Sequence, residues 1–157
     1  MIYLYNFPMD NITFYHIQNE EYVKNTCKLI EAEYLKGDKI LVRTKDDASQ
    51  EELNDVLWLF SKKAFIPHGS KFDDKASMQA VYITTDTEIP NNAQTLILYN
   101  IFHLTEYDKK YFKNLAVIFY GSDDSHLNNA RSLYKSLKLE GYNMAYSAAA
   151  LDGLDDE

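Results

Sequence analysis

Six consecutive apolar residues, Leu115 to Tyr120 (LAVIFY), constrain the fold more than any other feature of this sequence. A run without polar alternation is typical of a strand that is buried on both faces, as in a parallel sheet covered by helices. No uncharged segment is apolar enough to span a bilayer, since the longest, residues 89–105, carries several Asn, Gln and Thr side chains. The rest of the chain must therefore supply helices for both sides of a sheet.

Strands and helices alternate along the chain. The apolar patterns predict strands over residues 12–17, 39–44, 80–84, 95–99, 115–120 and 142–147. They predict helices over about 20–36, from Ser49 to Phe60, over 106–113, and from an Asp123 cap to Glu140. This order predicts an α/β, three-layer fold with a mainly parallel sheet and helices on both faces. The topology is Rossmann-like, without a nucleotide site.

Capping and stop residues mark several element ends. Asn19 is predicted to cap the first helix, and Gly37 to end it at the C′ position. Ser49 and Glu52 are predicted to form a capping box for the second helix. Residues 61–79, which follow that helix, are predicted to form a long loop.

Length and charge limit the class of protein. The 157 residues suit one domain, with residues 1–11 as an extension and residues 148–157 as an acidic, frayed tail. A formal net charge of −8 argues against nucleic acid as the main partner, because phosphate binding needs Lys and Arg. The N-terminus lacks the basic region of a signal peptide, so we expect a cytoplasmic protein with no membrane contact.

The sequence carries no motif for cofactor, metal or catalytic chemistry. The predicted turn Gln18–Glu21 lacks glycine and puts two carboxylates where a pyrophosphate would bind. The only cysteine, Cys27, lies on the apolar stripe of its helix and is predicted to be a core residue. We therefore expect no cofactor, no metal and no catalytic residue.

The four histidines show no metal-ligand spacing. His16 is expected to pack within its strand, and His126 to be solvated in the first turn of the last helix. His68 lies in the predicted loop, where a structural hydrogen bond is the favoured role. An alternative function stays open: an α/β nucleotide-binding or hydrolytic enzyme that uses His68 with Asp73 or Asp74.

The only tryptophan lies off the core stripe of its helix. On a helical wheel the apolar stripe consists of Leu53, Val56, Leu57 and Phe60. Trp58 falls about 140 degrees from the start of that stripe. With Phe65, Ile66 and Pro67 it could form an apolar surface for a partner, or the loop could fold back and cover it.

The last helix carries a basic row beside its predicted buried stripe. The stripe consists of Leu127, Ala130, Tyr134 and Leu137. Arg131, Lys135 and Lys138 follow one another at i, i+4 and i+7, with Tyr134 at their edge. The plain interpretation is a solvated charged face. The functional interpretation is a docking site for an acidic peptide, in which Arg holds a carboxylate and an aromatic pocket takes an apolar side chain.

These same two places carry a resemblance to a known family. The motifs are Thr13-Phe14-Tyr15, Leu57-Trp58, Phe65-Ile66-Pro67-His68, Ala130-Arg131-x-x-Tyr134-Lys135 and Glu140-Gly141-Tyr142. In this order and spacing they resemble the chi subunit of bacterial DNA polymerase III, over roughly residues 13–146. The segment from Leu57 to His68 is the most specific part, and residues 90–114 are only loosely similar.

The resemblance implies a single chi-like domain that acts as a non-enzymatic accessory protein of the clamp loader. It implies that Arg131, Tyr134 and Lys135, with Lys138 in the same basic row, bind the acidic, Phe-ended C-terminal tail of the single-stranded-DNA-binding protein. It further implies a surface of Trp58 and Phe65, with Ile66 and Pro67, that binds the psi subunit. In some bacteria the same surface of chi binds an XPD-like helicase.

Overall fold

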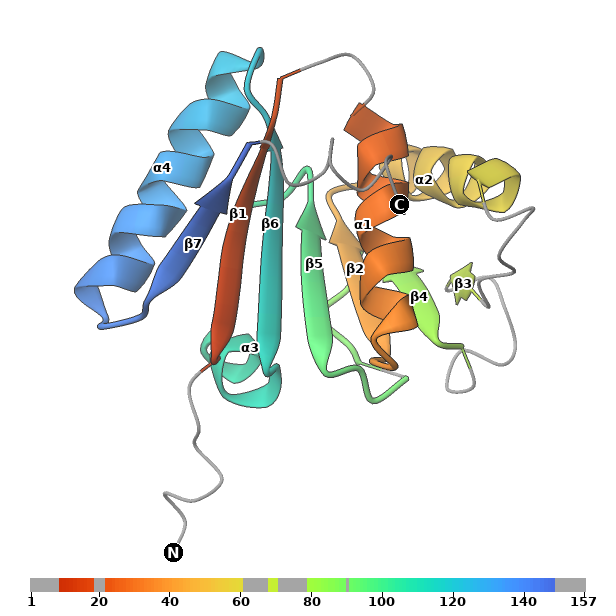
Figure 1. Cartoon of the computed structure of the whole chain (residues 1–157), viewed down its shortest axis with the longest axis horizontal. Helices are drawn as coiled ribbons and strands as arrows, with labels where there is room; N and C mark the ends of the chain where they lie inside the picture. The colour runs from red at the N-terminus through yellow and green to blue at the C-terminus, as the bar shows by residue number, and fades with distance from the viewer. Residues whose placement is uncertain (1–8, 19–21, 61–67, 71–78, 90, 149–157) are drawn as a thin grey trace, which may run out of the picture.

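The structure, a computed structural model of the whole chain, describes residues 9–18, 22–60, 68–70, 79–89 and 91–148. Those residues form a parallel sheet of seven strands in the order β3-β4-β2-β5-β6-β1-β7 (Figure 1). The strands are β1 Asn11–Ile17, β2 Ile40–Thr44, β3 His68–Ser70, β4 Val81–Thr84, β5 Thr95–Tyr99, β6 Asn114–Tyr120 and β7 Met144–Ser147. The N-terminal strand therefore lies between two strands from the last third of the chain.

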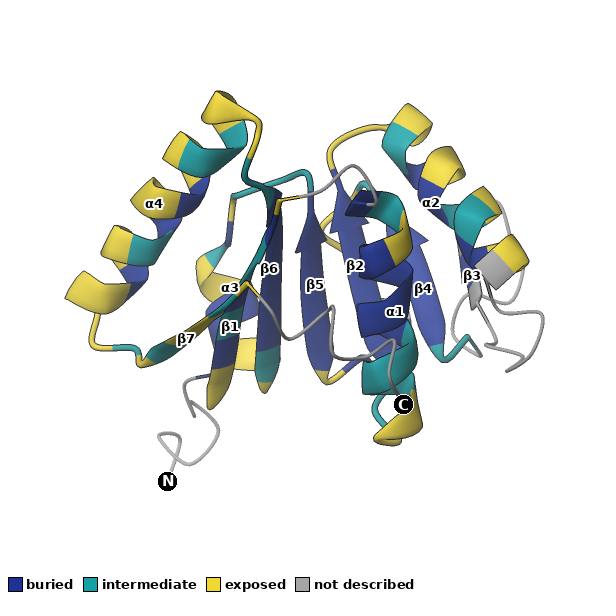
Figure 2. Ribbon diagram, turned by 45° about the horizontal axis from the view of Figure 1, so that its top comes forward, coloured by how far each residue is buried: buried dark blue, intermediate teal, exposed yellow. Residues whose placement is uncertain are grey.

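Helices cover both faces of the sheet. They are α1 Tyr22–Leu35, α2 Asp47–Phe60, α3 Glu106–Tyr111 and α4 Asp124–Leu139. Apolar side chains of α1 and α2 share one buried cluster with one face of the sheet, and those of α4 share a second cluster with the other face. Figure 2 shows the central strands as a buried layer between helices whose outer faces are exposed. The predicted three-layer α/β fold with helices on both faces is confirmed.

The apolar run Leu115 to Tyr120 forms all but the first residue of β6. Its alternate side chains enter the two clusters: Ala116 and Ile118 face α1, while Leu115, Val117 and Phe119 face α4. All five are buried. A strand that packs on both faces has no solvent-exposed position for a polar residue, and this explains the unbroken apolar sequence.

The structure departs from prediction most clearly at β3 and at the start of α2. The predicted loop over residues 61–79 contains β3, a three-residue edge strand that pairs with β4. The sequence His68-Gly69-Ser70 has no alternation of apolar and polar residues, so no local pattern predicts this strand. The cap of α2 is also different, because Asp46 accepts a hydrogen bond from the backbone N–H of Ser49 at 2.8 Å. The predicted Ser49–Glu52 capping box is therefore wrong: the helix begins three residues earlier than that box requires.

Other predicted ends agree with the structure. Gly37 takes a φ of 92° and donates its N–H to the Tyr34 carbonyl at the end of α1. Asp123 caps α4, accepting from the backbone N–H of His126. Asn11 begins β1 and Met9 is buried, although both fall within the predicted N-terminal extension. Residues 1–8 and most of the predicted tail, 149–157, lie outside the described residues.

A buried ion pair, which the sequence did not reveal, joins β2 to α3. Both guanidinium NH groups of Arg43 donate to the Asp108 carboxylate, at 2.7 and 3.2 Å, and its Nε donates to the Asp86 carbonyl. The two side chains are 3% and 1% exposed. Asp108 also accepts a hydrogen bond from the Thr105 backbone N–H, as part of a capping box. The same carboxylate therefore caps the N-terminus of α3 and anchors this helix to β2 through Arg43.

In the part of the chain that the structure describes, no helix is long and apolar enough to cross a membrane.

Candidate peptide-binding groove

A cavity of about 310 Å³ lies between α4 and the strands β1, β6 and β7. Its lining places it on the α4 face of the sheet. β7, one of its strands, forms an edge of the sheet (Figure 1). Its lining residues are Phe14, His16, Phe119, Leu127, Ala130, Arg131, Tyr134 and Tyr146. Five of these side chains, including the His16 imidazole, are aromatic, so the lining of the cavity is mainly apolar.

Strand register places the floor and one wall of this groove. Phe14 and His16 are two residues apart on β1 and so point to the same face of the sheet. Phe119 lies beside His16 in the register of β6, and Tyr146 lies beside Phe14 in the register of β7. Three strands far apart in sequence thus contribute neighbouring rings.

The helix supplies the opposite wall. Ala130 is buried against the sheet, and its small side chain leaves room beneath α4. One turn further on, the Tyr134 ring packs edge-on against Phe14, with ring centroids 5.3 Å apart. The predicted buried stripe of α4 omitted Leu133, which is 9% exposed and belongs to the core cluster.

The basic row of α4 is exposed, as its position on the wheel predicts. Arg131 lines the groove together with Tyr134. Lys135 and Lys138 continue the row along the same helix but do not line the cavity. The structure therefore brings two of the four predicted tail-binding residues into the groove and leaves the other two outside it on the same helix.

Sequence reasoning missed the strand residues of the groove. His16 Nδ1 and the Tyr146 hydroxyl form a hydrogen bond across the β1–β7 wall, between residues 130 positions apart. Burial and the nearby Arg131 charge lower the pKa of His16. His16 also stacks on Phe119, with ring centroids 4.9 Å apart, so the prediction that it packs within its strand is confirmed. No signal within either strand could have paired these two residues.

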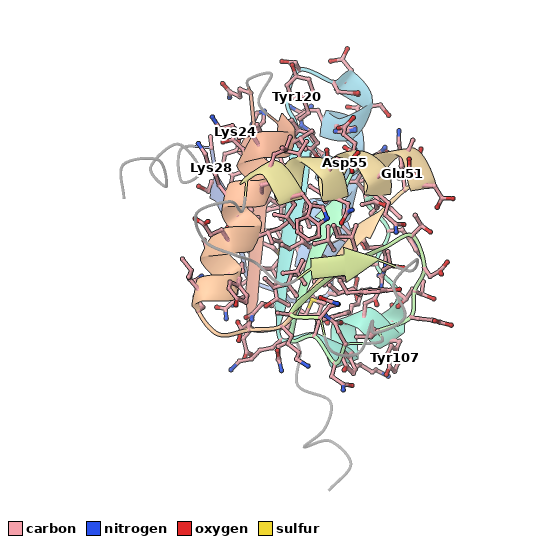
Figure 3. The ribbon with its side chains drawn as sticks, turned by 90° about the vertical axis from the view of Figure 1, so that its right-hand side faces the viewer. Lys24, Lys28, Glu51, Asp55, Tyr107 and Tyr120 are labelled. Atoms are coloured by element: carbon pink, nitrogen blue, oxygen red, sulfur yellow. The ribbon has the colours of Figure 1, made fainter. Side chains whose placement is uncertain are left out.

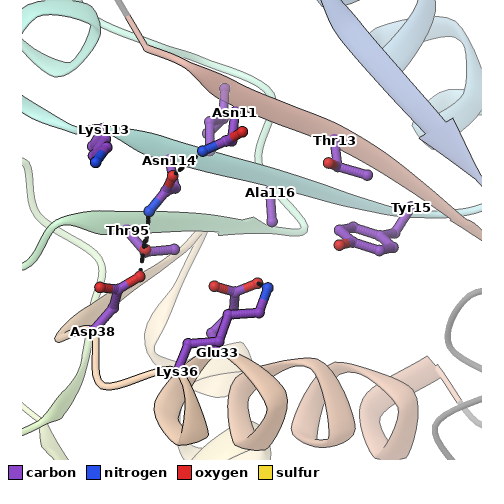
Figure 4. Close-up of a pocket in the computed structure, with 11 residues that line it drawn as sticks. Asn11, Thr13, Tyr15, Glu33, Lys36, Asp38, Thr95, Lys113, Asn114 and Ala116 are labelled. Atoms are coloured by element: carbon purple, nitrogen blue, oxygen red, sulfur yellow. Dashed lines mark hydrogen bonds and ion pairs between the residues drawn. The ribbon is translucent and has the colours of Figure 1, made fainter.

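A second cavity, of about 380 Å³, lies on the opposite face, between the start of β1 and β6 and the end of α1 (Figure 4). Several of its polar side chains contact one another. Asn11 donates to Asn114, Asn114 donates to Thr95, and Lys36 pairs with Glu33. Its charged lining residues are of both signs, Glu33 and Asp38 against Lys36 and Lys113.

The outer face of α2 carries exposed apolar groups. Trp58 is 52% exposed and its neighbour Leu59 is 67% exposed, so the prediction that Trp58 lies off the core stripe is confirmed. Leu53 and Leu57 on the stripe are fully buried. Glu51 and Asp55 lie on α2 before these apolar groups (Figure 3). Phe65, Ile66 and Pro67, predicted to share this surface, lie outside the described residues.

The cysteine and histidine side chains that could carry catalytic chemistry are in part buried and in part outside the description. Cys27 is fully buried, as predicted, and burial raises the pKa of its thiol to about 12. His126 was predicted to be solvated, and this is wrong: its ring is half-buried, and Nδ1 accepts from the Tyr120 backbone N–H. His68 begins β3, but its side chain lies outside the description, as do Asp73 and Asp74. Among the described residues no three His, Cys, Asp or Glu side chains gather as a metal site would require.

Comparison with known proteins agrees with the resemblance drawn from the motifs. The family model described as "DNA polymerase III chi subunit, HolC" matches residues 9–145. A protein of Rickettsia prowazekii named "Probable DNA polymerase III subunit chi" is 40% identical over 116 residues, which cover 70% of each chain. The "DNA polymerase III subunit chi" of Escherichia coli is 20% identical over 143 residues, covering 87% of this chain and 96% of that one. The protein of the same name from Pseudomonas aeruginosa is 28% identical over 93 residues, covering 57% of this chain and 63% of that one.

Proposed function

This chain belongs to the DNA polymerase III chi-subunit family, and on that premise we propose that it is a non-catalytic accessory subunit of the clamp loader. In the cytoplasm it links the clamp loader to the single-stranded-DNA-binding protein. The α4 groove holds the acidic, Phe-ended C-terminal tail of that protein. A separate surface on α2 binds a psi-type subunit or an XPD-like helicase.

One observation carries the tail-binding proposal: an aromatic cavity opens directly beside the basic row of α4. The cavity is floored by Phe14 and Phe119 and bordered by Arg131. A Phe-ended acidic peptide carries the complementary groups, an apolar ring followed by a carboxylate, with further carboxylates upstream. The ring would fill the cavity, and Arg131 would hold a carboxylate through two parallel hydrogen bonds.

Lys135 and Lys138, the other two cations of the row, affect the rate of association with the tail more than the stability of the complex. Lys135 and Lys138 are exposed and outside the cavity, so each contact with the tail contributes only ~0–1 kcal/mol. Their charge steers the acidic tail toward the groove and makes association salt-dependent. Arg131 and Tyr134 therefore determine affinity, and the two lysines determine rate.

The test is a titration of a fluorescent acidic peptide that ends in Phe, followed by anisotropy. Arg131→Glu should reduce affinity at least tenfold, which corresponds to about 1.4 kcal/mol. Lys110→Glu, an exposed change of the same charge on α3, is the matched control and should bind as the wild type does. Equal affinity of wild type and Arg131→Glu would remove the α4 groove as the tail site.

The second surface rests on the exposure of Trp58 and Leu59 next to each other on α2. Aromatic residues that are exposed in an isolated subunit are frequent anchors of interfaces. Trp58→Ala should abolish capture of the purified psi-type subunit while the melting temperature falls by no more than about 2–4 °C. Because Trp58 is the only tryptophan, its emission should shift to the blue when the partner buries it. A large loss of stability in Trp58→Ala would instead make this residue structural.

A further inference from the structure

The wall of the groove opposite α4 contains a polar pair, His16 and Tyr146. Their side chains are hydrogen-bonded to each other through Nδ1 and the hydroxyl. Both line the cavity, in which the remaining polar side-chain atoms come only from Arg131 and Tyr134. Tyr146 is 58% exposed, so a ligand that enters the groove can reach this side chain. The pair, on β1 and β7, and Arg131, on α4, therefore line the same cavity, whose other lining residues are mainly apolar.

The neighbouring strand fixes the imidazole in place. Phe119 stacks on the ring with an interplanar angle of 18°. Gly121 lies against the Nε2 end, where a Cβ would overlap the imidazole. With one flat side on Phe119 and one edge on Gly121, the ring has its Nδ1 committed to Tyr146. This residue is held in one orientation, as a binding group must be.

We propose that His16 and Tyr146 hold the terminal carboxylate of the bound peptide opposite Arg131, and that His16 takes up a proton when it does so. This inference rests on the proposed tail-binding function and adds to it a second anchor and a dependence on pH.

The number of hydrogen-bond donors that His16 and Tyr146 offer to the ligand depends on whether His16 is protonated. In the neutral tautomer of His16 that carries its proton on Nε2, Nδ1 is an acceptor and the Tyr146 hydroxyl donates to it. The phenol oxygen then offers only lone pairs to the cavity, and these repel a carboxylate. Once solvent has protonated His16, Nδ1–H donates to the phenol oxygen and the Tyr146 O–H is free to donate to the ligand. The site accepts an anion in this second state.

The surroundings of His16 set the direction of the proton linkage. Arg131 of α4 and Tyr146 of β7 are the titratable or charged groups that face it, and β6 contributes the uncharged Phe119 and Gly121. Burial and Arg131 lower the pKa of His16, so the ring is neutral near pH 7 in the free protein. A carboxylate between His16 and Arg131 offsets the Arg131 charge and raises that pKa in the complex. The peptide must therefore bind more tightly as the pH falls through this range.

The experiment measures peptide affinity from pH 8.0 to 5.5 at constant ionic strength, in wild type, His16→Gln, Tyr146→Phe and the control His103→Gln. His103 is exposed and lies outside the cavity. Wild type and the control should bind about tenfold more tightly at pH 5.5, the effect of a shift of about one pKa unit. His16→Gln should bind with a nearly flat pH profile, and Tyr146→Phe should bind more weakly than wild type at pH 5.5 because it lacks the hydroxyl donor. A peptide amidated at its C-terminus should bind more weakly and lose the pH dependence in wild type.

NMR titration of the His16 ring, in free and peptide-saturated protein, supplies a direct readout. Its pKa should rise on saturation. If wild type binds the peptide but His16→Gln keeps the same pH profile, or the amidated peptide keeps its pH dependence, this inference is overturned while the groove stands as the tail site. If wild type does not bind at any pH, the proposed function itself fails. Binding with an unchanged pH profile thus contradicts only this inference, whereas a lack of binding contradicts the proposed function.

Discussion

Removing one member of the Arg43–Asp108 pair should destabilise the protein more than any exposed substitution. The pair is bidentate and almost fully excluded from water, with side chains 3% and 1% exposed. Arg43→Met leaves a buried carboxylate without its counter-charge, which costs about 3–5 kcal/mol. A domain of this kind has a total stability of about 5–15 kcal/mol, so the variant loses a large share of it.

A double-mutant cycle separates the pair from its surroundings. Asp108→Asn should also destabilise, because it leaves the guanidinium of Arg43 buried beside a neutral group. The double variant Arg43→Met/Asp108→Asn buries no charge at this site, so its loss should be no larger than the greater single loss. Lys36→Met, which removes a side chain that is 65% exposed from its pair with Glu33, is the control and should cost less than either buried single change.

The measurement is urea unfolding at pH 7, followed by circular dichroism, with the free energy of unfolding extrapolated to water. A loss below about 1 kcal/mol for Arg43→Met, or strict additivity in the double variant, would refute the claim that this pair anchors α3 to β2.

Three further outcomes follow from the described contacts. Native Cys27 should resist a thiol reagent at pH 8, since its thiol is buried with a pKa raised to about 12; labelling within seconds would contradict this. Burial lowers the pKa of His126, so the unfolded chain binds more protons between that pKa and about 6.5. Stability should decrease as the pH is lowered through that window, and should decrease less in His126→Gln; equal losses would show that another group is responsible. Gly121→Ala should displace the His16 ring and cost about 1–3 kcal/mol, and His16→Ala should suppress this cost.

The sequence predicts the layers of this fold well because each layer follows from a local period. The apolar run of β6 and the stripes of α2 and α4 each repeat within a few residues, so burial can be inferred without knowing the neighbours. The exposure of Trp58 and Arg131 follows from the same periods. β3 could not be predicted this way, because its three residues become a strand only through pairing with β4.

The groove was only half predictable for a related reason. Arg131 and Tyr134 are on one helix, and their spacing places them together. The other wall depends on sheet order: His16 and Tyr146 are neighbours only because β1 and β7 pair. The Arg43–Asp108 pair is hidden in the same way, since 65 residues separate its members. A one-dimensional pattern does not contain strand order, so contacts that depend on it are found only in three dimensions.

The position of β1 has a consequence for how this chain is made. β1 is synthesised first, yet it pairs only with β6 and β7, beginning with Asn11 beside Asn114 across 103 residues. During translation, β2, β4 and β5 can pair while β1 still has neither of its partners. A ribosome-bound chain that stops after α3 should thus carry an unpaired N-terminal strand, exposed to proteases and chaperones. The α4 groove, which needs β1, β6, β7 and α4 together, must be among the last parts to form.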